Sequence, residues 1–128
     1  MNLLLDTHLL IWSATRNPKL SEEARAFISD TANSLWFSTA SLWETAIKNA
    51  LKRPDFNVDV STLRAGLLAN GYFELAVEGR HSLTFRDLSN HHRDPFDRML
   101  VAQAMTEVMI LLTADRALAN YGASVRVV

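Results

Sequence analysis

The sequence contains no cysteine, only four glycines and three prolines, and no excess of basic residues. The lack of cysteine excludes disulfide scaffolds, cysteine-based zinc sites and thiol chemistry. Thirteen Lys and Arg residues against fourteen Asp and Glu residues give a formal net charge of −1. This balance excludes a generally basic, histone-like nucleic-acid binder but leaves room for a local basic patch.

Long apolar runs are also missing, which bears on location. No stretch approaches the ~20 apolar residues of a membrane span. The first residues lack a basic n-region, and Asp6 and His8 interrupt the apolar run, so they do not form a signal peptide. We therefore expect a cytoplasmic protein with no membrane association.

The residues that are present have the composition of a globular protein. The chain has 128 residues and a mass of 14.4 kDa, with 48% hydrophobic and 21% charged residues. This length suits one ordinary domain, and neither an internal repeat nor a linker is visible. We expect a single domain over residues 1–128.

Strand-like and helix-like segments alternate along the chain. The expected strands are residues 2–5, 35–37, 73–77, 108–112 and 125–128. The expected helices begin at residue 21 and cover 39–52, 60–70, 79–88, 94–107 and 114–121, with polar loops at 53–59 and 89–94. The strand over 108–112 is continuously apolar, as is typical of a strand covered on both faces. The pattern predicts a parallel sheet between two layers of helices.

Two of these helices have clear internal signals. Asp94 is the residue type that caps a helix, and Pro95 suits the first helical position. The residues of this helix that should face the core are Phe96, Met99, Leu100 and Ala104. The helix over 39–52 has an apolar stripe formed by Trp43, Ile47, Ala50 and Leu51.

Four acidic residues lie where predicted strands end or the following helices begin. They are Asp6, Glu44, Asp97 and Asp115. In a parallel sheet, functional groups collect at the carboxyl ends of the strands, so these carboxylates should lie close together. Clustered carboxylates repel one another unless a cation lies among them, and oxygen ligands suit Mg²⁺ or Mn²⁺. Such sites typically serve phosphodiester hydrolysis.

Each acid also has a purely structural explanation. Asp6 can be a turn residue, and Glu44 can be a capping-box acid that pairs with Lys48 for only about 0.3–0.5 kcal/mol. Asp97 complements the dipole of its helix, and Asp115 can occupy the first turn of the next one. Taken one at a time these explanations suffice, whereas four acids at four strand ends together favour a metal site.

Four motifs in order make the chain recognisable. They are Leu3–His8 (LLLDTH), Ser38–Glu44 (STASLWE), His92–Ala104 (HRDPFDRMLVAQA) and Leu112–Asp115 (LTAD). With these motifs, spread over nearly its whole length, the chain closely resembles the PIN-domain family. Within that family it resembles the VapC-type toxins of bacterial type II toxin–antitoxin modules.

The resemblance implies a fold, an activity and partners. The fold would be a three-layer α/β/α PIN-like fold with a central, mostly parallel five-stranded sheet. The activity would be that of a Mg²⁺- or Mn²⁺-dependent endoribonuclease that leaves a 5′-phosphate and a 3′-hydroxyl. The expected partners are an RNA substrate, a cognate antitoxin protein that covers the site, and a second copy of the chain in a homodimer.

The family's acidic positions fall on the same four residues, which are therefore expected to be both catalytic and metal-binding. Asp6 and Asp97 are the expected direct or water-mediated metal ligands. Glu44 would complete the site and help to orient or deprotonate the attacking water. Asp115 would bind a second ion or a water molecule on the metal. Behind these ligands we place Thr113 as a support and Asp94, whose first assignment is helix capping.

Basic side chains near these acids are candidate phosphate contacts, which position RNA without reading its sequence. They are Lys48, Lys52, Arg53, Arg93, Arg98 and Arg116. Each of them can equally be part of a solvated helix face.

The histidines and tryptophans are not assigned to the metal site. Adjacent residues rarely face one metal, so His91 and His92 are assigned to a loop, and His8 to a contact with substrate or partner. The tryptophans are assigned to core or interface packing rather than to base stacking. They are Trp12, Trp36 and Trp43.

Other functions fit the sequence less well. A phosphorylated receiver domain needs paired acids after the first strand and a late lysine, but no lysine follows Lys52. A dehalogenase-type phosphatase needs Asp-x-Asp, whereas position 8 is histidine. The two alternatives that stay open are a metal-dependent deoxyribonuclease and a non-catalytic PIN module that binds RNA or protein.

Overall fold

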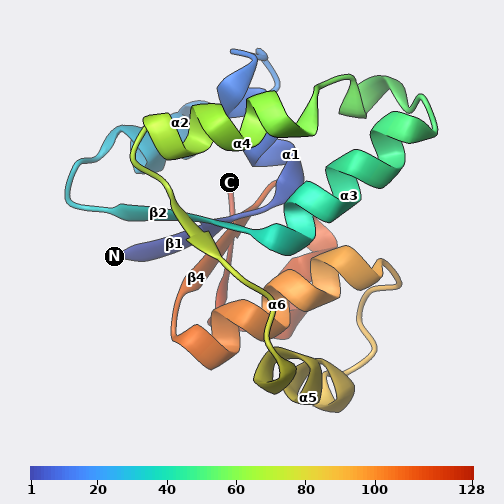
Figure 1. Ribbon diagram of the computed structural model, residues 1–128. Coiled ribbons are helices and arrows are strands. Elements are labelled where there is room, and N and C mark those ends of the chain that lie inside the picture. The colour runs from blue at the N-terminus through green and yellow to red at the C-terminus, as the bar shows by residue number, and fades with distance from the viewer.

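The computed structural model describes residues 1–128, which form a five-stranded sheet with helices on both faces (Figure 1). The strands are β1 (Asn2–Leu5), β2 (Ser34–Ser38), β3 (Phe73–Leu75), β4 (Ile110–Thr113) and β5 (Val125–Val127). The α-helices are α1 (Thr7–Ala14), α2 (Glu22–Ser29), α3 (Thr39–Ala50), α4 (Val60–Ala69), α5 (Gly79–Asp87) and α6 (Pro95–Glu107). Two 3₁₀ helices complete the fold, η1 (Pro54–Phe56) and η2 (Arg116–Tyr121).

The sheet has the strand order β3-β2-β1-β4-β5, and all neighbouring strands run parallel. Strand β1 lies in the centre, where Leu3 pairs with Leu35 of β2 on one side and Ile110 of β4 on the other. This confirms the expected five-stranded sheet, which is parallel throughout. The carboxyl ends of β1, β2 and β4 therefore meet at one edge.

Alternate side chains of β1 enter two separate cores. Leu3 and Leu5 pack with residues of α1, α2 and α4 on one face. Leu4 packs on the other face with residues of α6, β4 and η2. Figure 1 shows these two helical layers on opposite sides of the sheet, which confirms the three-layer architecture.

Helix α1 was not expected from the sequence. Its residues, THLLIWSA, are apolar nearly all round and therefore lack the periodicity of a surface helix. The available signal was Asp6, which caps the helix through a hydrogen bond from the Leu9 amide to its side chain. A 3₁₀ turn, η1, also interrupts the expected loop over residues 53–59.

Helix α3 is oriented differently from what its apolar stripe suggests. Trp43 and Leu51 are exposed at 65% and 67%, whereas the polar side chains of Ser41, Glu44 and Thr45 are buried. The buried face of α3 is therefore its polar face, because it lies against the carboxyl edge of the sheet where other polar groups gather.

The C-terminal elements differ from expectation in detail. Strand β4 starts at Ile110 because Val108 is the left-handed C-cap of α6, with φ 56°. The expected helix over residues 114–121 is the 3₁₀ helix η2. No helix of the chain is both long and apolar enough to cross a bilayer.

Candidate active site

Asp6 is held rigidly at the end of the central strand. Its backbone amide donates to the carbonyl of Leu112, and its Oδ1 accepts from the Leu9 amide at 2.9 Å. Its Oδ2 accepts from the Thr113 hydroxyl at 2.5 Å. Burial raises the pKa of Asp6 above its usual value, while the Thr113 hydrogen bond opposes this shift. The carboxylate is thus fixed in position by two donors.

Asp97 lies in the first turn of α6, and its carboxyl group has a strongly raised pKa. The Asp94 side chain caps this helix by accepting from the Phe96 amide at 2.8 Å and from the Asp97 amide. Burial raises the pKa of Asp97 to about 8, and the negative charges of Asp94, Asp6, Glu44 and Asp115 add to the rise. The pKa of Asp97 therefore responds to the charges of the other three acids that the sequence predicts at the site, as well as to that of Asp94.

Asp115 joins the same group from the end of β4. Its Oδ1 accepts from the Ala117 amide at 3.0 Å and caps η2. Its backbone amide donates to the Thr113 hydroxyl at 3.0 Å, and that hydroxyl in turn donates to Asp6. Thr113 therefore links two of the acids.

Glu44 reaches this region from α3 and is almost fully buried. Its Oε1 accepts from the Thr7 hydroxyl at 2.5 Å, and its Oε2 lies 2.6 Å from the Lys48 ammonium. The expected pairing of Glu44 with Lys48 is present, but it is a buried ion pair and not a surface one.

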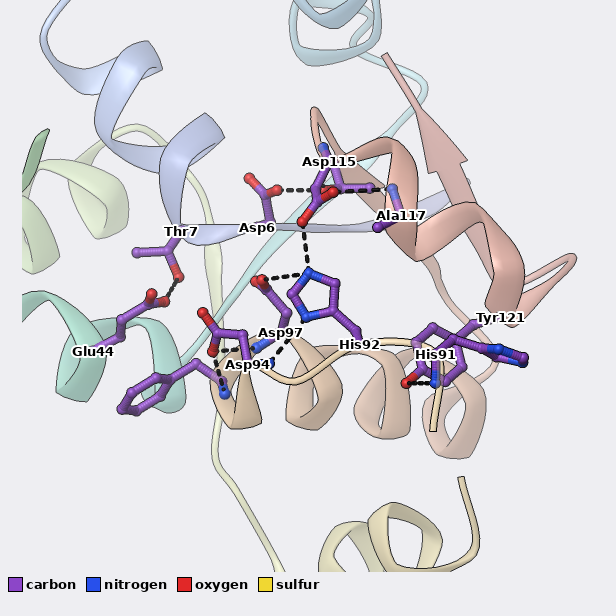
Figure 2. Close-up of polar contacts among 12 residues, drawn as sticks. Asp6, Thr7, Glu44, His91, His92, Asp94, Asp97, Asp115, Ala117 and Tyr121 are labelled. Carbon is purple, nitrogen blue, oxygen red and sulfur yellow. Dashed lines mark hydrogen bonds and ion pairs between the residues drawn. The ribbon is translucent and has the colours of Figure 1, made fainter. Parts of the chain in front are cut away.

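His92 belongs to the acidic cluster, although the sequence alone led us to assign it to a loop. Its Nε2 lies 2.8 Å from Oδ2 of Asp115 and 3.8 Å from Oδ2 of Asp97. Figure 2 shows the His92 ring between these two carboxylates. Its Nδ1 accepts from the Asp94 amide at 3.1 Å, so the ring proton is on Nε2 and is donated to Asp115. The sequence feature that could have indicated this is the position of His92 two residues before Asp94, the N-cap of α6.

An open cleft of about 380 Å³ brings these groups together. It is lined by Asp6, His8, Trp12, His92, Asp94, Asp97, Ala114 and Asp115. His8 Nε2 lies 3.0 Å from Oδ2 of Asp55, and the His8 ring lies beside that of Trp12. Trp12 is therefore placed at the acidic cleft as well as against the core.

The other tryptophans lie apart from the residues that line this cleft. Trp36 lies beside the ring of Phe73, with ring centroids 5.0 Å apart, and Trp43 meets Phe96 edge-on at 5.3 Å. His91 has its ring against that of Tyr121 and its amide hydrogen-bonded to the Tyr121 hydroxyl.

The expected phosphate contacts fall into three groups. Lys48 is partly buried and paired with the acids, while Arg98 lies over the ring of Phe85 and donates to the Leu88 carbonyl. The remaining four basic side chains are exposed and form no ion pair, so they are available to an outside anion. They are Lys52, Arg53, Arg93 and Arg116.

The donor set fits a hard divalent cation. Carboxylate oxygens of Asp97 and Asp115 lie within 4.8 Å of each other and of the His92 ring nitrogen, and Asp6 lines the same cleft. Carboxylate oxygens are the preferred ligands of Mg²⁺ and Mn²⁺. Burial and the charges of the neighbouring acids both raise the pKa of Asp97, and a bound cation would favour its charged form against both.

Comparisons with known proteins give a consistent result. The family model for the PIN domain matches residues 3–123. No curated protein has a sequence that matches this chain.

Several solved structures are similar. One is VapBC2 from Rickettsia felis bound to a DNA fragment from its promoter, with 11% identity, a TM-score of 0.69 and coverage of 99% of this chain and 97% of that one. Another is VapBC-1 from nontypeable Haemophilus influenzae, with 20% identity, a TM-score of 0.63 and coverage of 94% and 92%. A third is VapBC-5 from Mycobacterium tuberculosis, a member of the VapBC family of toxin–antitoxin systems, with 16% identity, a TM-score of 0.60 and coverage of 99% and 97%. At such low identities these likenesses show a shared fold.

Proposed function

The chain belongs to the PIN domain family, and from this premise we propose that it is a Mg²⁺- or Mn²⁺-dependent endoribonuclease, the toxin of a type II toxin–antitoxin module. The observation that carries the proposal is the convergence of Asp6, Asp97 and Asp115 on one open cleft, with the pKa of Asp97 raised to about 8. A carboxylate cluster of this kind is what divalent-metal hydrolysis of a phosphodiester requires.

Each acid then has a defined part. Asp6, Asp97 and Asp115 would hold the ion, and Glu44 adds its charge from the α3 side. When bound, Mg²⁺ or Mn²⁺ would supply positive charge to the scissile phosphate and lower the pKa of the attacking water. Thr113 keeps Asp6 in position, and His92 does the same for Asp115 by donating from Nε2.

Partners are proposed on the same basis. The likeness to VapBC-5, a toxin–antitoxin family member, supports a cognate antitoxin that covers the cleft. We propose in addition that the chain acts in the cytoplasm as a homodimer.

Expression of the chain in a bacterial host without antitoxin is expected to arrest growth. The physical reason is that an uncovered endoribonuclease degrades RNA that the cell needs. Growth is measured after induction of wild type and of Asp97→Asn, and the variant should grow normally. Normal growth with abundant soluble wild-type protein would contradict the toxin proposal.

Arg93→Ala and Lys52→Ala are each expected to weaken RNA binding across different sequences. Both side chains are exposed and unpaired, so each can neutralise one phosphate. Loss of one contact should flatten the slope of log affinity against log salt by about 0.7 for a single strand. The control is Arg64→Ala, because Arg64 is already paired with Glu74. Unchanged slopes in both variants would assign these residues to the solvated surface.

A further inference from the structure

Lys48 is an unusual charge in the site because its partly buried side chain lies among acids. Its side chain is only 19% exposed, and its ammonium lies 2.6 Å from Oε2 of Glu44 and 3.8 Å from Oδ2 of Asp94. A lysine that merely solvated the end of α3 would extend into water, which costs less than burying an ammonium.

Two aromatic rings hold the ammonium from the other sides. Its Nζ lies 4.8 Å from the ring centroid of Phe56 and 5.8 Å from that of Phe96. These distances are within the range of cation–π attraction, which strengthens as the cation is desolvated. The two rings come from η1 and α6, so two elements distant in sequence from each other hold the ammonium in one position.

Residues 94–97 contribute both to the acidic cluster and to the surroundings of Lys48. Asp94 faces Lys48 and caps α6, Phe96 places its ring at Lys48, and Asp97 is the acid with the raised pKa. The same turn of helix thus supports both the acids and the ammonium.

Glu44 is poorly suited to bind a divalent ion while Lys48 is in place. A Mg²⁺ ion lies about 2.1 Å from a carboxylate oxygen that it ligates. On Oε2 it would therefore come within about 5 Å of the Lys48 ammonium, and the two cations would repel each other. The other oxygen, Oε1, already accepts from Thr7.

We propose that Lys48 is a catalytic residue that contacts the scissile phosphate, and that Glu44 is the positioning residue that holds it. This rests on the proposed phosphodiesterase function and assigns to Lys48 the place that a second metal ion takes in two-metal sites. The site would then need only one divalent ion.

The chemistry of this assignment is electrostatic. Water attacks phosphorus and gives up a proton, the bond from phosphorus to the 3′-oxygen breaks, and that oxygen takes up a proton. Lys48 forms and breaks no bond in this reaction. Its ammonium neutralises the charge that builds up on the non-bridging phosphate oxygens, which a preorganised charge does at little cost.

The test combines Lys48→Met, Glu44→Gln and the double variant, with Lys19→Ala as a control at an exposed lysine. Methionine keeps the side chain as far as Cε and removes the ammonium. Cleavage of a single-stranded RNA is measured at saturating Mn²⁺, and the Mn²⁺ dissociation constant is measured separately by calorimetry.

We expect Lys48→Met to lower kcat by about a hundredfold or more, with a smaller effect on KM. Glu44→Gln should lose a similar factor, and the double variant should be no worse than Lys48→Met, because the two side chains act as one unit. The Mn²⁺ dissociation constant should stay within about threefold of wild type in all of them, whereas loss of a direct ligand would weaken binding more than the 10–100-fold seen for supporting residues.

Three results would overturn the assignment. Cleavage by Lys48→Met at the wild-type rate would make Lys48 a structural counterion, and multiplied losses in the double variant would show independent roles. Weakening of Mn²⁺ binding by 10–100-fold in Glu44→Gln would make Glu44 a support for the metal ligands, and a larger loss would make it a metal ligand. If Lys48→Met alone does not fold, the double variant, which leaves no unpaired buried charge, carries the test.

Failure of wild type to cleave RNA would instead reject the proposed function, and the calorimetry would still decide whether Glu44 binds the ion.

Discussion

Asp97→Asn is expected to abolish metal-dependent RNA cleavage while the far-UV circular dichroism spectrum stays that of the folded protein. Asparagine keeps the size of the side chain and can still complement the helix start, but it removes the negative charge that a divalent cation needs. Because replacing residues that only support a metal ligand already costs 10–100-fold, loss of this ligand should lower the rate by more than about a hundredfold.

The measurement compares wild type, Asp97→Asn and Asp59→Asn on RNA and DNA strands of the same sequence. Asp59 caps α4 outside the site, so its variant controls for loss of a helix-capping acid and should cleave like wild type. A rate near wild type for Asp97→Asn would reduce Asp97 to a structural role. Equal cleavage of DNA would favour the deoxyribonuclease alternative, and no cleavage of either strand by wild type would favour the non-catalytic one.

Mn²⁺ is expected to raise the melting temperature of wild type, because the ion binds the folded state and relieves repulsion among the acids. At a hundredfold excess over the dissociation constant the gain is about 2.7 kcal/mol. For a domain of this size that corresponds to a shift of about 10 °C. In EDTA, Asp6→Asn and Asp97→Asn should be at least as stable as wild type, and both should gain less from Mn²⁺.

The same repulsion predicts how stability without metal depends on pH. The pKa of Asp97 is about 8 in the folded protein against 3.8 for a free side chain, so the folded state keeps a proton that the unfolded state releases. The resulting stabilisation is complete below pH 3.8 and is lost as the pH rises through 8. In EDTA, the melting temperature of wild type should therefore fall relative to Asp97→Asn between pH 5 and about pH 9.

Thermal melts with EDTA and with Mn²⁺ across this pH range separate a metal site from a set of structural caps. Structural caps predict that each substitution destabilises the protein and that Mn²⁺ has no effect. Asp59→Asn is again the control, and its Mn²⁺ shift should equal that of wild type. A wild type that does not respond to millimolar Mn²⁺ would rule out a tight preformed site.

Local sequence patterns determined most of the secondary structure. The apolar run of β1 and the Asp94-Pro95 start of α6 are visible in the chain because strand burial and helix capping act over a few residues. The presence of acids at strand ends follows from the same patterns, once the sheet is taken to be parallel.

Patterns of this kind failed where tertiary contacts outweigh local ones. Helix α1 has no polar face because helices and strands surround it, so its sequence shows no helical period. Helix α3 has its polar side buried and Trp43 exposed, because its buried side faces other polar groups and not the apolar core.

Only the tertiary structure decided the geometry of the site. The Asp6 carboxylate meets the Thr113 hydroxyl across 107 positions of the chain, and His92 meets Asp115 across 23. The pKa of Asp97 depends on its burial and on four other carboxylates, and the ammonium of Lys48 lies beside rings from η1 and α6. Sequence spacing alone cannot supply these relations, because electrostatic interactions depend on distances in space that strand pairing sets.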